Sequence, residues 1–227
     1  MSALGPRDVD AAYAVRFSGD PRFQPWRSAM WRVLVEGWFS RWIAEDAVVL
    51  DFGCGNGEFL NAVTAARRVG VDFRSSRARG LDAGVEFICS DDFLLPTIES
   101  GSVDVVFCSN LLEHLPDRET VVAFLGELRR VMRPEGRLLI LGPNIRYTGN
   151  AYWDFFDHLI PFTHHTLREA LATVSLEVET MVPRFLPYTT AGGRRFPLWL
   201  IRAYLRFPLA WRLFGAQFFC VSRLDDC

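Results

Sequence analysis

The stretch "VVLDFGCGNGEFL" (48–60) decides the fold of this 227-residue chain, because an apolar run passes directly into a turn with three glycines in five positions. Such a turn is typical of sites where the backbone comes close to a ligand, since glycine has no Cβ and adopts positive φ freely. A nucleoside triphosphate, a dinucleotide or another nucleotide-like cofactor fits such a turn, and the same turn also occurs without a ligand.

The spacing of the glycines removes two of these ligands. A P-loop ends in G-K-[ST], yet all 25 basic residues of this chain are arginine. A dinucleotide fingerprint is G-x-G-x-x-G, but after Gly53 and Gly55 its third position is Glu58, whose carboxylate would repel a pyrophosphate. What remains is D-x-G-x-G-x-G, from Asp51 to Gly57. The acid suits a cationic group and the N-terminus of a following helix favours a carboxylate, so a ligand that carries both charges is expected.

Seven apolar runs predict strands, with helical stretches between them. The predicted strands are 47–52, 68–73, 85–90, 103–109, 136–142, 176–182 and 217–223. The predicted helices are 57–66, 118–132 and 163–174, besides a helical N-terminal part over 8–46. Continuous apolar strands that alternate with helices indicate an α/β fold with a mostly parallel sheet covered on both faces.

The N-terminal helical part carries an apolar stripe at helical spacing, formed by Trp31, Leu34, Val35, Trp38 and Trp42. The stripe predicts either a helix packed on the core or a lid whose aromatic side chains face a ligand. We therefore expect a single domain built of four parts. These are an N-terminal helical lid (1–46), a cofactor-binding core (47–182), an insertion that forms part of the acceptor site (183–216) and the last strand (217–223).

Acidic and polar residues follow the ends of the next three strands. Asp72 lies 21 positions after Asp51, where an acidic side chain accepts hydrogen bonds from ribose hydroxyls. Asp91 and Asp92 end the third strand, where a carboxylate can accept from an adenine amino group. The fourth strand ends in "FCSNLLEHLPD" (107–117). The alternatives are turn or N-cap roles for the aspartates and a loop-closing role for 113–114.

With these motifs in order, the sequence resembles the class I S-adenosylmethionine-dependent methyltransferases. The stretches that carry the resemblance are "VLDFGCGNGEFL", "VGVDF", "EFICSDDFLLP", "SVDVVFCSNLLEHLPD" and "ELRRVMRPEGRLLILGPN", within 47–182. The family implies a Rossmann-like seven-stranded sheet with one antiparallel strand and S-adenosylmethionine as the cofactor. It also implies that Glu58 is tolerated as a surface or cap residue. The cofactor-binding residues implied are Asp51, Gly53, Gly55, Gly57, Asp72, Phe73, Asp91, Asp92, Phe93, Asn110 and Leu111.

The acceptor site is expected in the loop after the fifth strand, "RYTGNAYWDFFDHLIPFTHH" (146–165). His158, next to Asp157, is the predicted general base, since histidine exchanges protons near neutral pH. His164 and His165 are expected only to begin a helix. The predicted substrate-binding residues are Tyr147, Tyr152, Trp153 and His114. No metal is expected, because the five cysteines include no C-x-x-C pair.

The charge of the chain is divided along its length. Residues 1–179 carry 18 arginines and 25 acidic residues, whereas 180–224 carry seven arginines and no acidic residue. Pro197 and Pro208 interrupt the Arg- and aromatic-rich stretch 194–215, so no single long helix is expected there. The favoured interpretation is a buried helix pair whose arginine stems reach the surface. A clamp for an anionic acceptor and peripheral contact with an anionic membrane are the alternatives.

These observations predict an enzyme that methylates a small organic acceptor in a biosynthetic route. A sugar, a glycolipid precursor or a secondary metabolite is expected, with O-methylation favoured. The alternative is a catalytically silent, cofactor-binding scaffold for another biosynthetic enzyme. The formal charge of −2 argues against nucleic acid as a partner, and a homodimer stays open. Residues 1–13 show no signal-peptide pattern and no apolar run is long enough to span a membrane, so a cytoplasmic location is expected.

Overall fold

One seven-stranded sheet organises the computed structural model, which describes residues 23–188 and 195–225. The strands follow the spatial order β3-β2-β1-β4-β5-β7-β6. Their bounds are β1 Val48–Phe52, β2 Arg67–Asp72, β3 Val85–Cys89, β4 Val103–Ser109, β5 Met132–Pro143, β6 Leu176–Val182 and β7 Gln217–Leu224. All seven predicted strands are therefore confirmed, and β5 begins four residues earlier than the sequence indicated.

The direction of the strands also agrees with the expectation. β1 pairs in parallel with β2 and β4, and the parallel ladder extends to β3 and β5. β7 runs antiparallel to both of its neighbours, with Leu139 opposite Val221. Because the five strands β1 to β5 are parallel, their carboxyl ends share one edge of the sheet, which is where ligands bind in open α/β folds.

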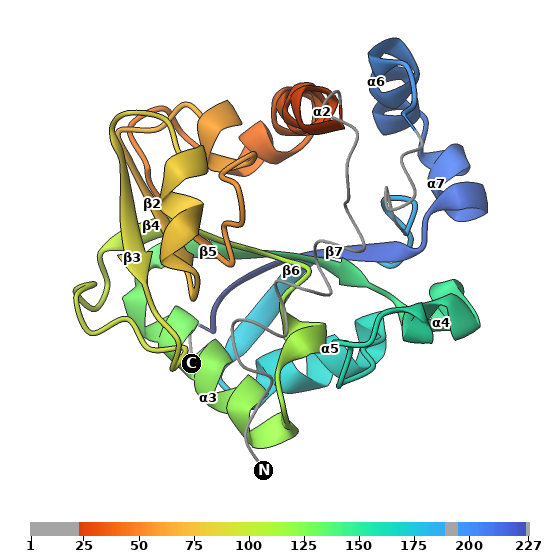
Figure 1. Cartoon of the computed structure of the whole chain (residues 1–227). Helices are drawn as coiled ribbons and strands as arrows, with labels where there is room; N and C mark the ends of the chain where they lie inside the picture. The colour runs from red at the N-terminus through yellow and green to blue at the C-terminus, as the bar shows by residue number, and fades with distance from the viewer. Residues whose placement is uncertain (1–22, 189–194, 226–227) are drawn as a thin grey trace.

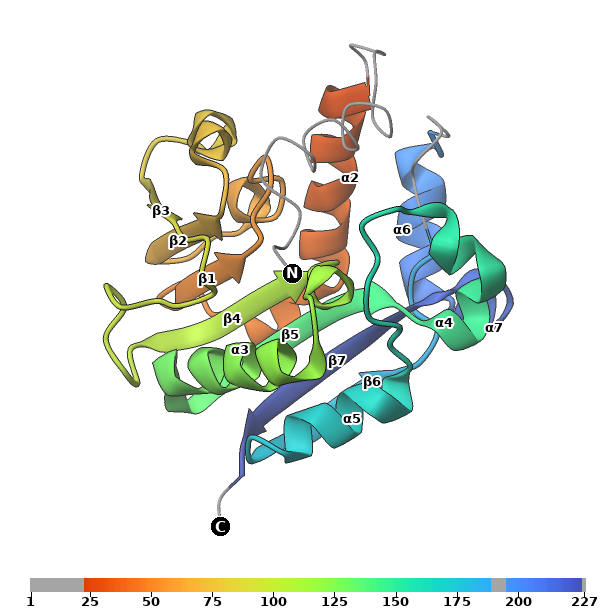
Figure 2. The same cartoon turned by 60° about the horizontal axis from the view of Figure 1, so that its bottom comes forward.

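Helices cover both faces of the sheet (Figures 1 and 2). On one face lie α3 (Arg118–Val131) and α5 (His164–Ala172), whose buried leucines pack with strand residues in one core cluster. On the other face lie α2 (Phe23–Gly37), the 3-10 helix η1 (Phe39–Trp42), α6 (Leu198–Arg206) and α7 (Pro208–Phe214), which share a second cluster. The Rossmann-like arrangement with helices on both faces is confirmed.

The apolar stripe of α2 and η1 packs into the second cluster. The centre of the Trp38 ring lies 4.9 Å from the ring centres of both Phe185 and Trp211, two residues that are far from it in the sequence. Trp31 contacts Phe107 of β4 edge to face. The stripe is therefore part of the core, which agrees with the first of the two sequence-based interpretations. Residues 8–22 of the predicted helical part lie outside the described residues.

The predicted helix over 57–66 is wrong. The chain forms only the 3-10 helix η2 (Leu60–Ala62) before β2 begins at Arg67. The glycine turn uses the first part of the 14-residue connection between β1 and β2, and Gly57 has φ +78°. The β-branched Val63 and Thr64 then favour extended backbone, so too few residues remain for a full helix.

The predictions for the other helical segments fared better. α3 and α5 lie within one or two residues of the expected bounds. Pro197 caps α6 and Pro208 occupies the first turn of α7, so the prolines interrupt the insertion as predicted. None of the described helices has the length and apolarity needed to cross a membrane.

Candidate active site

The glycine turn after β1 forms the centre of the site. Gly53, Gly55 and Gly57 have φ of +81°, +54° and +78°, a region that side chains with a Cβ seldom adopt. The amides of Gly53 and Cys54 both donate to the carbonyl of Val71, which ties the turn to β2. A Cβ built on Gly55 would meet no atom within 4 Å, so the turn presents open backbone to a ligand.

Three buried carboxylates surround this turn. Asp51, Glu58 and Asp72 are 3%, 6% and 4% exposed. Burial, and then the charges of Glu58 and Asp72, hold the pKa of Asp51 well above its ordinary value of 3.8. The Asp72 carboxylate accepts from the amides of Gly55, at 3.1 Å, and Arg74, at 3.0 Å. Each of its oxygens retains a second lone pair for hydroxyl donors.

The residues around the turn fit S-adenosylmethionine. This cofactor carries an ammonium and a sulfonium, and both positive charges suit a buried group of carboxylates. Its ribose hydroxyls can donate to the remaining lone pairs of Asp72, and the open face of Gly55 leaves room for close approach. The donor set therefore matches the cofactor that the sequence implied.

Glu58 is not the surface residue that the sequence indicated. Its side chain is 4% exposed, accepts a hydrogen bond from Gln24 Nε2 at 2.7 Å and lies 3.3 Å from Arg27 Nε. Gln24 and Arg27 belong to α2, so this contact fixes the N-terminal helix against the glycine turn. Sequence patterns did not indicate this contact, because Gln24 and Arg27 each lie more than 30 positions from Glu58.

The two predicted aspartates after β3 have different surroundings. Asp92 Oδ1 accepts from Ser90 Oγ and from the amide of Leu94, both at 3.1 Å, as the turn alternative predicted. Asp91 is exposed on the same turn. Phe93 has φ +62° and packs edge to face on Phe124 of α3, which fixes the turn on the core. Both residues are exposed, and because Asp92 is engaged within the turn, Asp91 is the one that we expect to accept from an adenine.

Asn110 and Leu111 follow β4 beside the glycine turn. Asn110 has φ +51°, which asparagine tolerates better than most residues. A Cβ on Gly53 would lie 3.3 Å from Leu111 Cδ1, so the two loops are in close contact. Phe73, after β2, lies under the Arg74 guanidinium, 4.8 Å from its ring centre. The cofactor residues predicted from four strands thus gather at one edge of the sheet.

The 3-10 helix η4 (Leu112–His114) links this edge to the acceptor loop. The Glu113 carbonyl accepts from the amides of Leu159, at 2.7 Å, and Ile160, at 3.2 Å. His114 Nδ1 lies 2.8 Å from the carbonyl oxygen of Asp157 and 3.5 Å from its Oδ2. When Nδ1 carries the proton and donates a hydrogen bond to the Asp157 carbonyl, Nε2 is left as an acceptor.

His158 lies inside an aromatic enclosure in the same loop. Its ring centre is 4.6 Å from Tyr152, 4.9 Å from Phe155 and 5.0 Å from His114, and the residue is 8% exposed. The Tyr152 hydroxyl donates to the Ile160 carbonyl, and burial raises the pKa of Tyr152. Tyr152 therefore shapes the loop around His158 rather than facing solvent.

The remaining predicted acceptor residues have distinct surroundings. Trp153 is 53% exposed. The Tyr147 ring lies under the guanidinium of Arg184, 4.7 Å from it. Thr163 caps α5 in a capping box with Thr166, which agrees with the helix-start role expected there. Asn144, which sequence reasoning missed, is fully buried and its Nδ2 lies 3.0 Å from His164 Nδ1.

The two histidines and Glu113 also have a spacing that sequence motifs did not indicate. One ligand atom from each of Glu113, His114 and His158 lies within 4.8 Å of the others, close enough for one divalent cation. The two histidines lie on different loops, so no short sequence motif such as H-x-x-H or C-x-x-C indicates the group.

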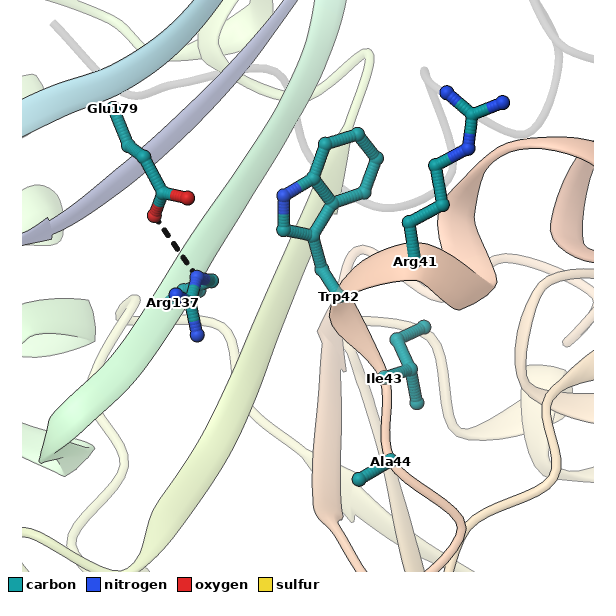
Figure 3. A pocket seen from close by; sticks show the side chains of 6 residues that line it. All are labelled: Arg41, Trp42, Ile43, Ala44, Arg137 and Glu179. Carbon is teal, nitrogen blue, oxygen red and sulfur yellow. Dashed lines mark hydrogen bonds and ion pairs between the residues drawn. The ribbon is translucent and has the colours of Figure 1, made fainter.

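A hollow of about 410 Å³ lies away from this site (Figure 3). Its lining includes Trp42, Arg137 and Glu179, and an ion pair of 2.9 Å joins the last two. Arg137 lies near the start of the parallel part of β5, at the edge of the sheet opposite the glycine turn. Because the predicted chemistry lies at the carboxyl ends, we do not assign this hollow to the active site.

Comparisons with known proteins agree with this geometry. Residues 50–140 match the family described as "Methyltransferase domain". A tRNA (carboxymethyluridine(34)-5-O)-methyltransferase of Macaca fascicularis is 32% identical over 123 residues, which cover 52% of this chain and 18% of that protein. A ubiquinone biosynthesis O-methyltransferase of Bordetella bronchiseptica is 36% identical over 104 residues, covering 39% and 43%. The matched parts thus span less than half of these curated relatives.

A solved structure extends the similarity to nearly the whole chain. The S-adenosylmethionine-dependent methyltransferase of Archaeoglobus fulgidus aligns with a TM-score of 0.65 at 20% identity, over 95% of this chain and 100% of that one. The chain thus has the fold of the class I S-adenosylmethionine-dependent methyltransferases, and residues 50–140 match the methyltransferase-domain family. Together with the donor set around the glycine turn, this match gives S-adenosylmethionine as the cofactor.

Proposed function

We propose that the chain transfers the methyl group of S-adenosylmethionine to a hydroxyl of a small organic acceptor in a biosynthetic route. The observation that carries the proposal is the contact of His114 Nδ1 with Asp157, beside the glycine turn. A hydroxyl acceptor must lose a proton during methyl transfer, so a positioned base accelerates the reaction. The loop after β4 would supply that base, and the acceptor loop after β5 would orient it, next to the residues that would hold the cofactor.

Bound S-adenosylmethionine supplies a methyl group on a sulfonium, which is open to attack by a nucleophile. The carboxylates of Asp51 and Asp72 would hold its cationic and hydroxyl groups, next to the turn on which Leu111 packs. Asp157 orients the His114 ring so that Nε2 can take the proton of the acceptor hydroxyl. The aromatic rings around His158 would limit the access of water to this part of the loop.

Geometry favours His114 over His158 as the base. The His114 side chain is 27% exposed and Asp157 orients it, so an acceptor can reach Nε2. His158 is 8% exposed and stacks on Phe155. We assign His158 the role of supporting the His114 ring by edge contact at 5.0 Å. The sequence-based prediction of His158 as base remains the competing assignment.

The surroundings of the loop support a small acceptor. The rings of Tyr152 and Phe155 lie against His158, which in turn contacts His114, and such aromatic surroundings suit a compact, partly apolar molecule. Among the relatives, the name of the ubiquinone biosynthesis O-methyltransferase is the one that agrees with a small hydroxylated acceptor.

The test is an assay with methyl-labelled S-adenosylmethionine and two acceptor pools, one of catechols, sugars and prenylated phenols and one of unmodified tRNA. We expect label in the small-molecule fraction. Label in tRNA alone would contradict the proposed acceptor class. Binding of S-adenosylhomocysteine without any methylated product would favour the silent scaffold instead.

A further inference from the structure

The insertion is only partly buried and leaves seven large apolar side chains exposed, which corrects the favoured sequence-based interpretation of a buried helix pair. Of the twelve large apolar side chains that the described residues leave exposed, seven belong to the insertion, each 40–71% exposed. We call them the α6–α7 surface: Phe196, Trp199, Leu200, Phe207, Leu209, Leu213 and Phe214. Contiguous exposed patches of this kind mark contact sites for proteins or membranes.

The exposure is a property of firmly packed helices. Leu205 of α6 and Trp211 of α7 are 3% and 7% exposed and pack in the cluster that includes α2. Trp26 Nε1 of α2 donates to the Phe196 carbonyl at 3.0 Å. The inner sides of α6 and α7 are therefore packed on the body of the protein, at whose periphery the two helices lie (Figures 1 and 2). The exposed apolar side chains belong to the outer sides of these helices.

Positive charge accompanies this surface. Arg195, Arg202, Arg206 and Arg212 are exposed among the apolar side chains, and residues 183–224 contain no acidic residue. The ion pair of Arg202 with Glu36 spans 3.9 Å between side chains that are 54% and 57% exposed, so it neutralises little charge. Helices with Trp, Phe and Leu on one side and arginines beside them bind the interface of anionic bilayers.

The α6–α7 surface lies at the same end of the molecule as the acceptor loop. The amide of Asn144, where α4 (Ile145–Thr148) begins, donates to the carbonyl of Ala216 after α7, at 2.9 Å. Tyr188 contacts Phe155 of the acceptor loop at 5.5 Å. The loop itself exposes three more large apolar side chains, Trp153, Phe156 and Leu159. Ten of the twelve exposed apolar side chains thus belong to the insertion and to the acceptor loop, two segments that are in contact with each other.

We propose that the α6–α7 surface docks on an anionic lipid bilayer and that the methyl acceptor is a hydroxylated molecule dissolved in that bilayer. The arginines meet lipid phosphates, and the aromatic and leucine side chains enter the boundary between headgroups and acyl chains. An anionic bilayer repels the net charge of −7 that residues 1–179 carry, so the basic insertion is the part that turns toward the lipid. The docking stands by itself, whereas the acceptor class rests on the proposed methyl transfer.

The test of docking is co-sedimentation of the full chain with vesicles of equal parts phosphatidylcholine and phosphatidylglycerol, and with phosphatidylcholine alone. We expect binding to the anionic vesicles that weakens with salt. Trp199→Ser/Phe214→Ser should weaken binding at least about tenfold. Arg206→Ser/Arg212→Ser should weaken it roughly 30-fold at low salt. All four side chains are exposed, so these variants should keep the fold.

Two matched controls lie on exposed positions elsewhere. Leu94→Ser/Val122→Ser removes apolar side chains that are 49% and 39% exposed, and Arg118→Ser/Arg129→Ser removes two arginines of α3. Both should bind vesicles as the unchanged chain does. Controls that lose binding as strongly as the surface variants would overturn the proposal, as would an unchanged chain that does not bind.

A second measurement separates lipid from other occupants of the surface. Light scattering on the purified chain should give the same mass before and after Trp199→Ser/Phe214→Ser. A dimer that the double variant converts to a monomer would assign the surface to a second copy and overturn the docking. Methylation of a soluble acceptor without vesicle binding would refute this inference while leaving the proposed function intact. Vesicle binding without methyl transfer to any acceptor would refute the proposed function and leave the docking.

Discussion

His114 Nδ1 lies 2.8 Å from the carbonyl oxygen of Asp157, although the two residues are 43 positions apart. The contact joins the loop after β4 to the loop after β5, and the Glu113 carbonyl strengthens it by accepting two amides from the same acceptor loop. A proton placed on Nδ1 by this contact leaves Nε2 as the basic atom. The contact therefore fixes the tautomer of His114 and also joins the cofactor edge of the sheet to the acceptor loop.

The first prediction separates the two histidines. His114→Gln should lower kcat about 100-fold or more, since a general base contributes that much, while the affinity for S-adenosylhomocysteine stays unchanged. His158→Gln should cost much less. His165→Gln, on the exposed start of α5, is the matched control and should leave kcat unaltered. A large loss for His158→Gln with a mild effect of His114→Gln would return the base to His158.

The same variants decide between a base and a metal ligand, because both histidines lie within the possible cation site with Glu113. A base acts without metal, so extensive dialysis against EDTA should leave kcat of the unchanged chain intact, and the acidic limb of its pH–rate profile should vanish in His114→Gln. Loss of activity with EDTA and recovery with a divalent cation would count against the base assignment.

The second prediction concerns Asp51. The folded chain binds the proton of Asp51 more tightly than the unfolded chain, because burial raises its pKa above 3.8. Stability from this group is therefore complete below 3.8 and is lost as the pH rises through the raised pKa. Asp51→Asn removes that loss, so Tm at neutral pH should rise, by about 2–4 °C for each kcal/mol regained.

The cost of Asp51→Asn should appear in cofactor binding. The ammonium of the cofactor binds the ionised carboxylate better, so the affinity of the unchanged chain for S-adenosylhomocysteine should increase as the pH rises. The variant should bind weakly with a flat pH dependence, measured by calorimetric titration. Equal affinity of both chains across the pH range would show that Asp51 does not face the cofactor charge.

Much of the fold followed from the sequence because its signals were local. Continuous apolar strands such as Val103–Ser109 and the prolines at 197 and 208 set element types and breaks within a few residues. The predicted helix over 57–66 was wrong because the glycine turn and η2 occupy much of the connection between β1 and β2. Hydrophobic periodicity does not indicate how many residues such a turn uses. Strand ends gathered the predicted cofactor residues at one edge because parallel strands share that edge.

The side-chain partners did not follow from the sequence because they depend on contacts between distant segments. Sequence adjacency suggested that Asp157 serves His158, whereas the fold places its carbonyl and carboxylate beside His114. Glu58 looked like an exposed helix residue, and its partners on α2 precede it by more than 30 positions. Apolar composition in the insertion suggested burial, because composition does not say which side of a helix meets the core.

The third prediction concerns the contact of Glu58 with α2. Glu58→Ala removes the partner of Gln24 and Arg27 and should lower the free energy of unfolding by about 1.5–3 kcal/mol, the usual loss for a hydrogen bond to a charged group. Glu58→Gln keeps an acceptor and should lose less. Urea unfolding checks both, with Glu119→Gln on the exposed face of α3 as control. Equal midpoints for all variants would mean that α2 is held by its aromatic packing alone.

The fourth prediction tests the cofactor site itself through Asp72. Asp72→Ala removes the acceptor for ribose hydroxyls and the acceptor of the Gly55 amide, so affinity for S-adenosylhomocysteine should fall at least about 100-fold. Asp72→Asn keeps one oxygen and should bind with intermediate affinity. Glu119→Ala removes an exposed carboxylate from α3 and should bind as the unchanged chain does. Because Asp72 also fixes the turn, thermal unfolding must accompany the titration. A variant that unfolds early yet binds normally would assign Asp72 to the turn alone, whereas a stable variant without binding would assign it to the cofactor.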